Sequence, residues 1–89
     1  RAMEELALRL SHCKKLHKDQ DRAGLRKSVH RLIAIAEQVG MALVARVAAD
    51  VVICIDAGDD TATAATLSRL IRSGERSLTA IWDLPDITI

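Results

Sequence analysis

The sequence predicts an all-α protein that folds as an antiparallel up-down-up-down four-helix bundle. Apolar residues recur three and four positions apart along four segments, which is the period of a helix with one buried face. Short breaks rich in Gly and Asp separate these segments. The chain has no Phe or Tyr and only one Trp, so its core must be aliphatic and alanine-rich, which suits helices better than strands. Because 89 residues cannot enclose two independent cores, residues 1–89 are expected to form one domain.

Residues 2–18 are expected to form the first helix. Its apolar stripe consists of Met3, Leu6, Leu10 and Cys13, followed by Leu16 or His17. Acidic residues near its start are favourable there, because the N-terminus is the positive end of the helix dipole. Cys13 and His17 are four residues apart, a spacing that fits two metal ligands, but two ligands without a third do not make a zinc site. We therefore expect no metal here.

The second helix is expected over residues 22–39. The break before it, residues 19–24, contains Asp19 and Asp21, either of which can cap the helix N-terminus. Gly40 then supplies a C-terminal stop. The buried stripe of this helix comprises Leu25, Val29, Leu32, Ala36 and Val39.

Residues 41–57 fit two structures. Val44, Val47, Val51 and Cys54 lie on one face of a helix, yet the run 51–55 also fits a buried parallel strand. We favour a helix, because the run continues an alanine-rich helical segment and no second strand is available to pair with it.

The fourth helix is expected over residues 62–82, after a turn at 58–61. One face carries Leu67, Leu70, Ile71, Gly74, Leu78 and Ile81. Gly74 costs helix propensity, about 1 kcal/mol relative to alanine, and so predicts a close contact with another helix. Pro85 ends the pattern, and residues 83–89 are expected to form a tail.

Charge is distributed unevenly along the chain, although the net charge is only +1. Residues 1–31 carry nine Lys/Arg and four Asp/Glu, whereas the remainder carries four and eight. A basic first part fits a solvated helix face, an acidic protein surface, a phosphate group or nucleic acid. Because the chain starts at Arg1 without a methionine, we expect a fragment or a processed protein.

The two cysteines and the lack of a long apolar run predict a cytoplasmic protein. Cys13 and Cys54 have no CxxC spacing and lie in helical patterns, as expected for reduced core residues. No secretory signal is visible, and the most apolar run, residues 51–55, is too short to span a membrane.

His30 is the residue that carries chemistry. On a helix it lies beside Arg26, Lys27, Ile33 and Ala34, just off the buried stripe. The spacing therefore predicts an exposed imidazole, next to a small residue, that a partner can reach. An exposed histidine is largely neutral near pH 7, so that a ring nitrogen can act as a nucleophile. Neighbouring cations disfavour the protonated ring and stabilise an anionic group bound to it.

The motif that starts at His30 resembles the signature of histidine-containing phosphotransfer (HPt) domains, H-x-L-K-G-x-A-x-x-x-G. His30, Leu32, Ala36 and Gly40 match it. Ala34 stands where the family has glycine, and Ile33 stands where it has lysine. The helical lead-in, the alanine-rich third helix, the Gly-Asp turn and the final helix extend the resemblance over most of the chain.

The resemblance implies a phosphorelay carrier. His30 would accept a phosphoryl group from the aspartate of a response-regulator receiver domain and pass it to another receiver, and a hybrid histidine kinase is a further candidate partner. The receiver would supply Mg²⁺ and the catalytic groups, so this chain would be no enzyme, need no cofactor and act as a monomer. The expected partner-binding residues are Arg26, Lys27, Arg31, Ile33, Ala34 and Glu37. Ile33 is expected to form an apolar docking patch with Ala34 and parts of Leu32 and Ile35.

Three alternatives stay open. Without the family's lysine, the domain can be a degenerate docking or dimerisation bundle that transfers no phosphate. The segment IAEQVGMALVARVAADV is also similar to a helix-turn-helix, but residues 41–55 offer one cation, Arg46, where a recognition helix needs several polar side chains. His12 and His17 compete with His30 for the role of phosphoryl acceptor, although neither has its motif.

Overall fold

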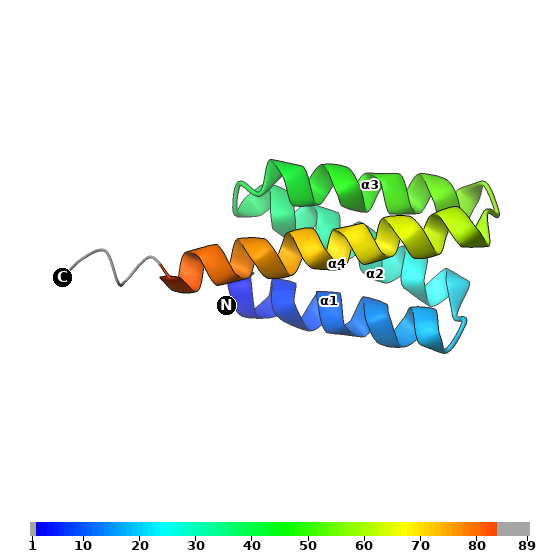
Figure 1. The fold of residues 1–89 in the computed structure, drawn as a ribbon, viewed down its shortest axis with the longest axis horizontal. Coiled ribbons are helices and arrows are strands. Elements are labelled where there is room, and N and C mark those ends of the chain that lie inside the picture. The colour runs from blue at the N-terminus through cyan, green and yellow to red at the C-terminus, as the bar shows by residue number, and fades with distance from the viewer. Residues whose placement is uncertain (1, 84–89) are drawn as a thin grey trace.

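The computed structural model describes residues 2–83, together with the side chains of residues 3–79. This part consists of four helices, α1 (Ala2–Lys18), α2 (Arg22–Gln38), α3 (Ala42–Asp56) and α4 (Asp60–Asp83), and holds no strand (Figure 1). The all-α prediction is confirmed, and residues 51–55 are helical. Each helix begins and ends within two residues of the range expected from the sequence. The expectation that the tail begins at Asp83 is wrong, because Asp83 is the last residue of α4. The rest of the expected tail, residues 84–89 with Pro85, and the side chain of Ile81 lie outside the described residues.

The helices pack as a ring of four. α2 contacts α1 and α3, and α4 contacts α3 and α1, whereas the backbones of the two diagonal pairs, α1 with α3 and α2 with α4, are not in contact. Every helix therefore has two flanks that face neighbours, one face toward the centre and one toward solvent.

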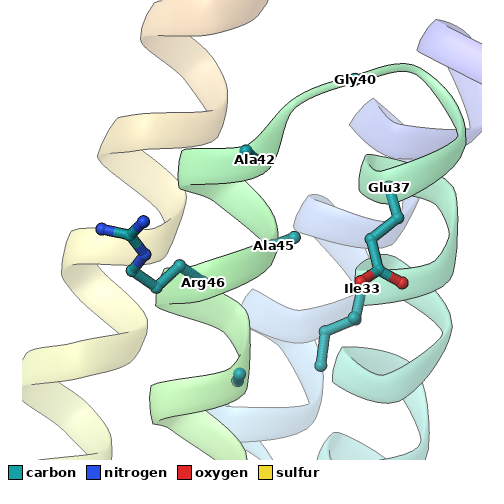
Figure 2. Close-up of a pocket in the computed structure, with 7 residues that line it drawn as sticks. Ile33, Glu37, Gly40, Ala42, Ala45 and Arg46 are labelled. Atoms are coloured by element: carbon teal, nitrogen blue, oxygen red, sulfur yellow. The ribbon is translucent and has the colours of Figure 1, made fainter.

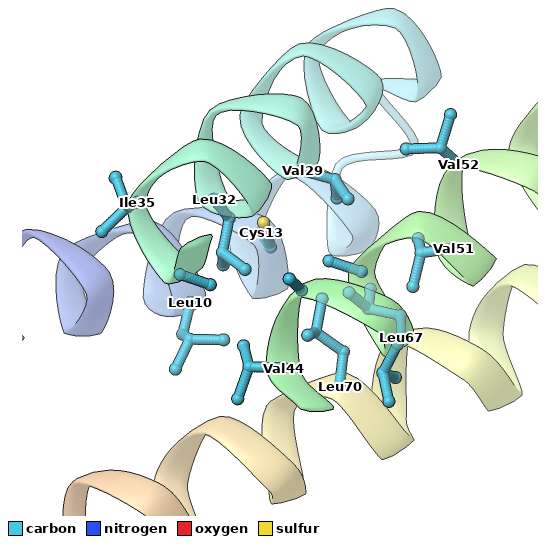
Figure 3. Packing of buried hydrophobic residues seen from close by; sticks show 14 of the residues in the cluster. Leu10, Cys13, Val29, Leu32, Ile35, Val44, Val51, Val52, Leu67 and Leu70 are labelled. Carbon is cyan, nitrogen blue, oxygen red and sulfur yellow. The ribbon is translucent and has the colours of Figure 1, made fainter. Parts of the chain in front are cut away.

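The centre of the ring is aliphatic, as the composition predicts (Figure 3). Small residues such as Ala36 and Ala48 are fully buried, and this lets the helix backbones approach closely. Each fully buried Leu or Val contributes about 1.5–3 kcal/mol relative to its exposed state. The largest side chains with almost no exposure are Leu6, Cys13, Val29, Leu32, Val44, Val47, Val51 and Leu70.

The three tight turns between the helices share one backbone conformation. Gly40 (φ 77°) and Gly58 (φ 70°) end α2 and α3 in the left-handed region, and Gln20 (φ 59°) does so after α1. In each turn, the N–H of the next residue donates a hydrogen bond to the carbonyl five residues earlier, for example Met41 N to Ala36 O at 2.8 Å. This is the Schellman arrangement. These bonds satisfy carbonyls that a helix end leaves without a partner.

Side chains cap the next helices. Asp21, rather than Asp19, caps α2, and its Oδ1 accepts a hydrogen bond from Gly24 N at 2.9 Å. Asp59 does the same before α4, where Ala62 N donates to its Oδ1 at 3.0 Å.

Gly74 is buried where α4 meets α1. A Cβ at this position would lie 2.6 Å from Cδ1 of Leu10. The close helix contact that the sequence predicts at this glycine is confirmed.

Candidate functional site

His30 is the middle residue of α2 and is exposed, as the helical pattern predicts. Its neighbours Val29 and Leu32 are fully buried and fix the face that α2 turns inward. The imidazole therefore stands on the outer face of a helix that is held in place by the core.

Arg26, one turn before His30, is bound by Asp56, the last residue of α3. Its Nε donates to Asp56 Oδ1 at 2.7 Å, and its Nη2 donates to Oδ2 at 3.1 Å. Hydrogen bonds from Arg26 lower the pKa of Asp56; desolvation opposes this in part, and the charges of Arg26 and then His30 lower the pKa further. His30 is thus near enough to Asp56 for its charge to act on the carboxylate.

Asp56 was not among the residues expected at the site. It belongs to a different helix, and no local motif marks it. The signal available in the sequence is its register: Arg26 and Asp56 are 14 and 16 residues from Gly40, so folding α3 back along α2 brings them level.

The remaining expected residues of α2 divide into two groups. Lys27, Arg31 and Ala34 are exposed, together with Glu37. Ile33 is half-buried and packs against the core. The structure thus brings His30, Arg26 and Ile33 to the side of α2 that borders α3, while Lys27 and Arg31 lie farther round the helix.

A shallow groove runs between α2 and α3, beyond Ile33 (Figure 2). Its sides carry Glu37 on α2 and Arg46 on α3, and His30 is not among its lining residues. The lining consists of Ile33, Glu37, Gly40, Ala42, Ala45, Arg46 and Ala49.

The expectation that Leu32 and Ile35 add to an exposed apolar patch is wrong. Leu32 is fully buried and Ile35 is 6% exposed. Ile35 lies two turns after Ser28, on the flank of α2 that faces α1, so it is covered by that helix. The alanines of α3 supply the apolar surface beside Ile33 instead.

The other two histidines differ from His30 in their surroundings. His12 is exposed, but its Nδ1 lies 3.3 Å from the hydroxyl of buried Ser28, within hydrogen-bonding distance. The Cys13 thiol donates to the same hydroxyl at 3.5 Å, and burial raises the pKa of Cys13. His17 is exposed in the last turn of α1.

Chemically, α2 offers an exposed imidazole one turn after a bound guanidinium. Among the described residues no three His, Cys, Asp or Glu side chains are grouped so that they could hold a metal ion. None of the described helices is long and apolar enough to cross a membrane. Comparisons of the chain with protein-family models, with curated proteins and with solved structures found no match.

Proposed function

We propose that this domain is a phosphocarrier of the HPt type. His30 receives a phosphoryl group from the aspartate of one receiver domain and passes it to another. One observation carries the proposal: His30 stands exposed at the centre of α2, near the bound guanidinium of Arg26. In this proposal the domain acts in the cytoplasm as a monomer, without a cofactor of its own, and Mg²⁺ belongs to the receiver.

The transfer needs little from the carrier beyond its nucleophile. A neutral ring nitrogen of His30 forms the N–P bond while the acyl-phosphate bond of the receiver breaks and its aspartate leaves as a carboxylate. The positive charge left on the ring is relieved when the proton on its other nitrogen passes to solvent. Arg26 and Lys27, within one turn of His30, offer cations to the transferred group.

We propose further that successive helices run in opposite directions, as in an up-down-up-down antiparallel bundle. The connections are three residues long, which favours antiparallel neighbours. Cross-helix partners such as Cys13 with Ser28, and Arg26 with Asp56, lie at nearly equal distances in sequence from the intervening turn. This order sets His30 opposite the second half of α3.

The groove beside Ile33 supports a docking role for the same face. An apolar wall at Ile33 and an alanine floor suit burial against a partner, and this burial gives affinity. The charges of Lys27 and Arg31 then steer the encounter, an effect that salt weakens.

Transfer of label from a panel of phosphorylated receiver domains tests the function. The wild-type chain should acquire an acid-labile phosphoryl group, and His30→Gln should abolish it. His12→Gln and His17→Gln are the matched controls and should keep the label. Labelling that survives in His30→Gln and disappears in His17→Gln would transfer the role to His17.

A docking or dimerisation bundle without transfer is the second candidate. The observation that favours it is the exposure of Ile53 (64%) and Leu43 (57%) on α3. Sedimentation velocity measures the oligomeric state, and the label-transfer experiment measures phosphate uptake. A dimer that binds receivers but takes up no phosphate is this second candidate. A nucleic-acid role is not proposed, because Arg46 is the single cation of α3.

A further inference from the structure

We propose that Asp56 is a positioning residue for the histidine site, since it holds the guanidinium of Arg26 where a phosphoryl group on His30 can meet it. The inference rests on the proposed function of His30. It adds a role for a residue of α3 that makes no covalent bond and touches no reacting atom.

The contact between Arg26 and Asp56 is bidentate. Nε and Nη2 of Arg26 donate to the two different carboxylate oxygens, at 2.7 and 3.1 Å. A bidentate contact fixes the plane of the guanidinium as well as its position. Since the group has five N–H donors, three remain for the oxygens of a phosphoryl group.

The direction of helix side chains brings the ring of His30 toward Arg26. Long side chains on a helix lean toward its N-terminus, so the ring of His30 lies over the turn that carries Arg26. The position of Asp56 is fixed as well, because α3 ends immediately after it in the Schellman turn at Gly58. A carboxylate on a rigid helix end can therefore restrain an otherwise flexible arginine.

The stability of α3 alone does not account for an acidic residue at position 56. A negative charge at a helix C-terminus is unfavourable, because that end of the dipole is already negative. Arg26 offsets this charge from the neighbouring helix. The pair also brings no net charge to the site, whereas a bare carboxylate near His30 would repel a phosphoryl group.

The ion pair predicts an order of phosphorylation rates at His30 among its variants. Arg26→Ala should be phosphorylated most slowly, because it removes the N–H donors and leaves the negative charge of Asp56 without a counter-charge. Asp56→Ala should be slowed less, since Arg26 remains but is no longer held in place. The double variant should be faster than Arg26→Ala, because the repelling charge is gone.

Phosphoramidate, a small phosphoryl donor, tests this without a receiver, so docking does not enter. The rate of phosphohistidine formation is followed by ³¹P NMR on the full chain. We expect Asp56→Ala to lower the rate about threefold to tenfold, and Asp56→Glu, which keeps the carboxylate, to recover part of it. A merely structural role would not produce the partial recovery in the double variant.

Arg22 and Asp60 provide a matched control. They form another exposed Arg–Asp pair, which joins the first residue of α2 to the first residue of α4, with Arg22 two turns before His30. Arg22→Ala and Asp60→Ala repeat the charge changes away from the site and should alter the rate less than about twofold. Circular dichroism confirms that all variants are folded.

Each remaining outcome has one meaning. A rate for Asp56→Ala equal to or above that of the wild type, with His30 still labelled, overturns the positioning role and leaves the phosphocarrier intact. Equal slowing in the Arg22 and Asp60 controls also overturns it, because the effect would then be one of general charge. If neither phosphoramidate nor any receiver labels wild-type His30, the proposed function fails and the role of Asp56 fails with it.

Discussion

Gly74 of α4 lies against Leu10 of α1 so closely that a Cβ on the glycine would be 2.6 Å from one methyl carbon of the leucine and 3.1 Å from the other. Leu10 is 3% exposed, so its methyl groups have little room to move away. The missing side chain at position 74 thus sets how near the two helices approach.

Gly74→Ala should destabilise the fold by about 1 kcal/mol, because overpacking of about 1–3 kcal/mol exceeds the gain in helix propensity of about 1 kcal/mol. Chemical denaturation measures the free energy of unfolding. In a Leu10→Val background, which lacks the two δ-carbons, the same substitution should instead stabilise. An identical effect in both backgrounds would contradict the contact.

Gln20 adopts a left-handed backbone (φ 59°), in which a Cβ is unfavourable. Gln20→Gly should therefore stabilise the protein by about 0.5–1 kcal/mol. Gly40→Ala and Gly58→Ala are the mirror controls and should each destabilise by about 1 kcal/mol. Nothing lies within 4 Å of a Cβ at either glycine, so that cost would come from the backbone alone. In thermal denaturation, Gln20→Gly should raise the melting temperature, whereas Gly40→Ala and Gly58→Ala should lower it.

The ion pair between Arg26 and Asp56 predicts a pH-dependent part of the stability. Arg26 lowers the pKa of Asp56 in the folded chain, so the contribution is fully present above the unfolded pKa of the carboxyl group and is lost as the pH falls through the lowered value. The difference in melting temperature between wild type and Asp56→Asn should therefore be present at neutral pH and vanish in strong acid. A difference that grows on acidification would contradict this assignment.

The two cysteines should react at different rates with a thiol reagent. Cys13 is buried, its pKa is raised by burial, and its thiol donates to Ser28, whereas Cys54 is half-exposed. Cys54 should react first in the native protein, and Cys13 only when the bundle opens. Mass spectrometry after brief alkylation identifies the modified residue. Faster modification of Cys13 would show that the seam between α1 and α2 opens more readily than its packing implies.

Ile33 allows a test of the proposed docking of a receiver at the groove between α2 and α3. Ile33→Asp should weaken receiver binding, because it places an unpaired charge at an apolar contact. Leu8→Asp makes the same kind of change at an exposed position (69%) on α1 and should leave binding unchanged. Titration calorimetry with a receiver measures both. If Ile33→Asp binds like the wild type, the docking face lies elsewhere.

Ile33→Lys restores the residue of the HPt motif and separates two forms of the proposed function. Faster label transfer in this variant indicates a degenerate carrier whose missing lysine limits it. Unchanged or slower transfer indicates a carrier whose partner is adapted to the apolar groove. The rate of label transfer from a single phosphorylated receiver gives the comparison.

Helical periodicity was enough to predict the four helices and the outward position of His30, because both depend only on neighbours within a turn or two. The same pattern misplaced Ile35. It describes one buried stripe, whereas α2 is covered on two flanks by α1 and α3 as well as on its inner face. Burial on a flank depends on which neighbour lies there, and the spacing within one helix does not contain that information.

Asp56 was missed for a related reason. Its partner is 30 residues away, and its role appears only when the register of α3 against α2 is known. The choice between Asp19 and Asp21 as the cap of α2 was also beyond the sequence pattern. Both have the right side chain, and the turn at Gln20 decides between them.

The ring arrangement has a consequence for how the chain opens. Three of its four seams join helices that follow one another in sequence, and the seam between α1 and α4 alone joins the two ends. Closing that seam costs the most loop entropy, so it is expected to form last and to open first. His30, Arg26 and Asp56 belong to the opposite seam, between α2 and α3. Partial opening at Gly74 can therefore expose the inner faces of α1 and α4 to hydrogen exchange while the packing of α2 against α3, which positions His30, stays assembled.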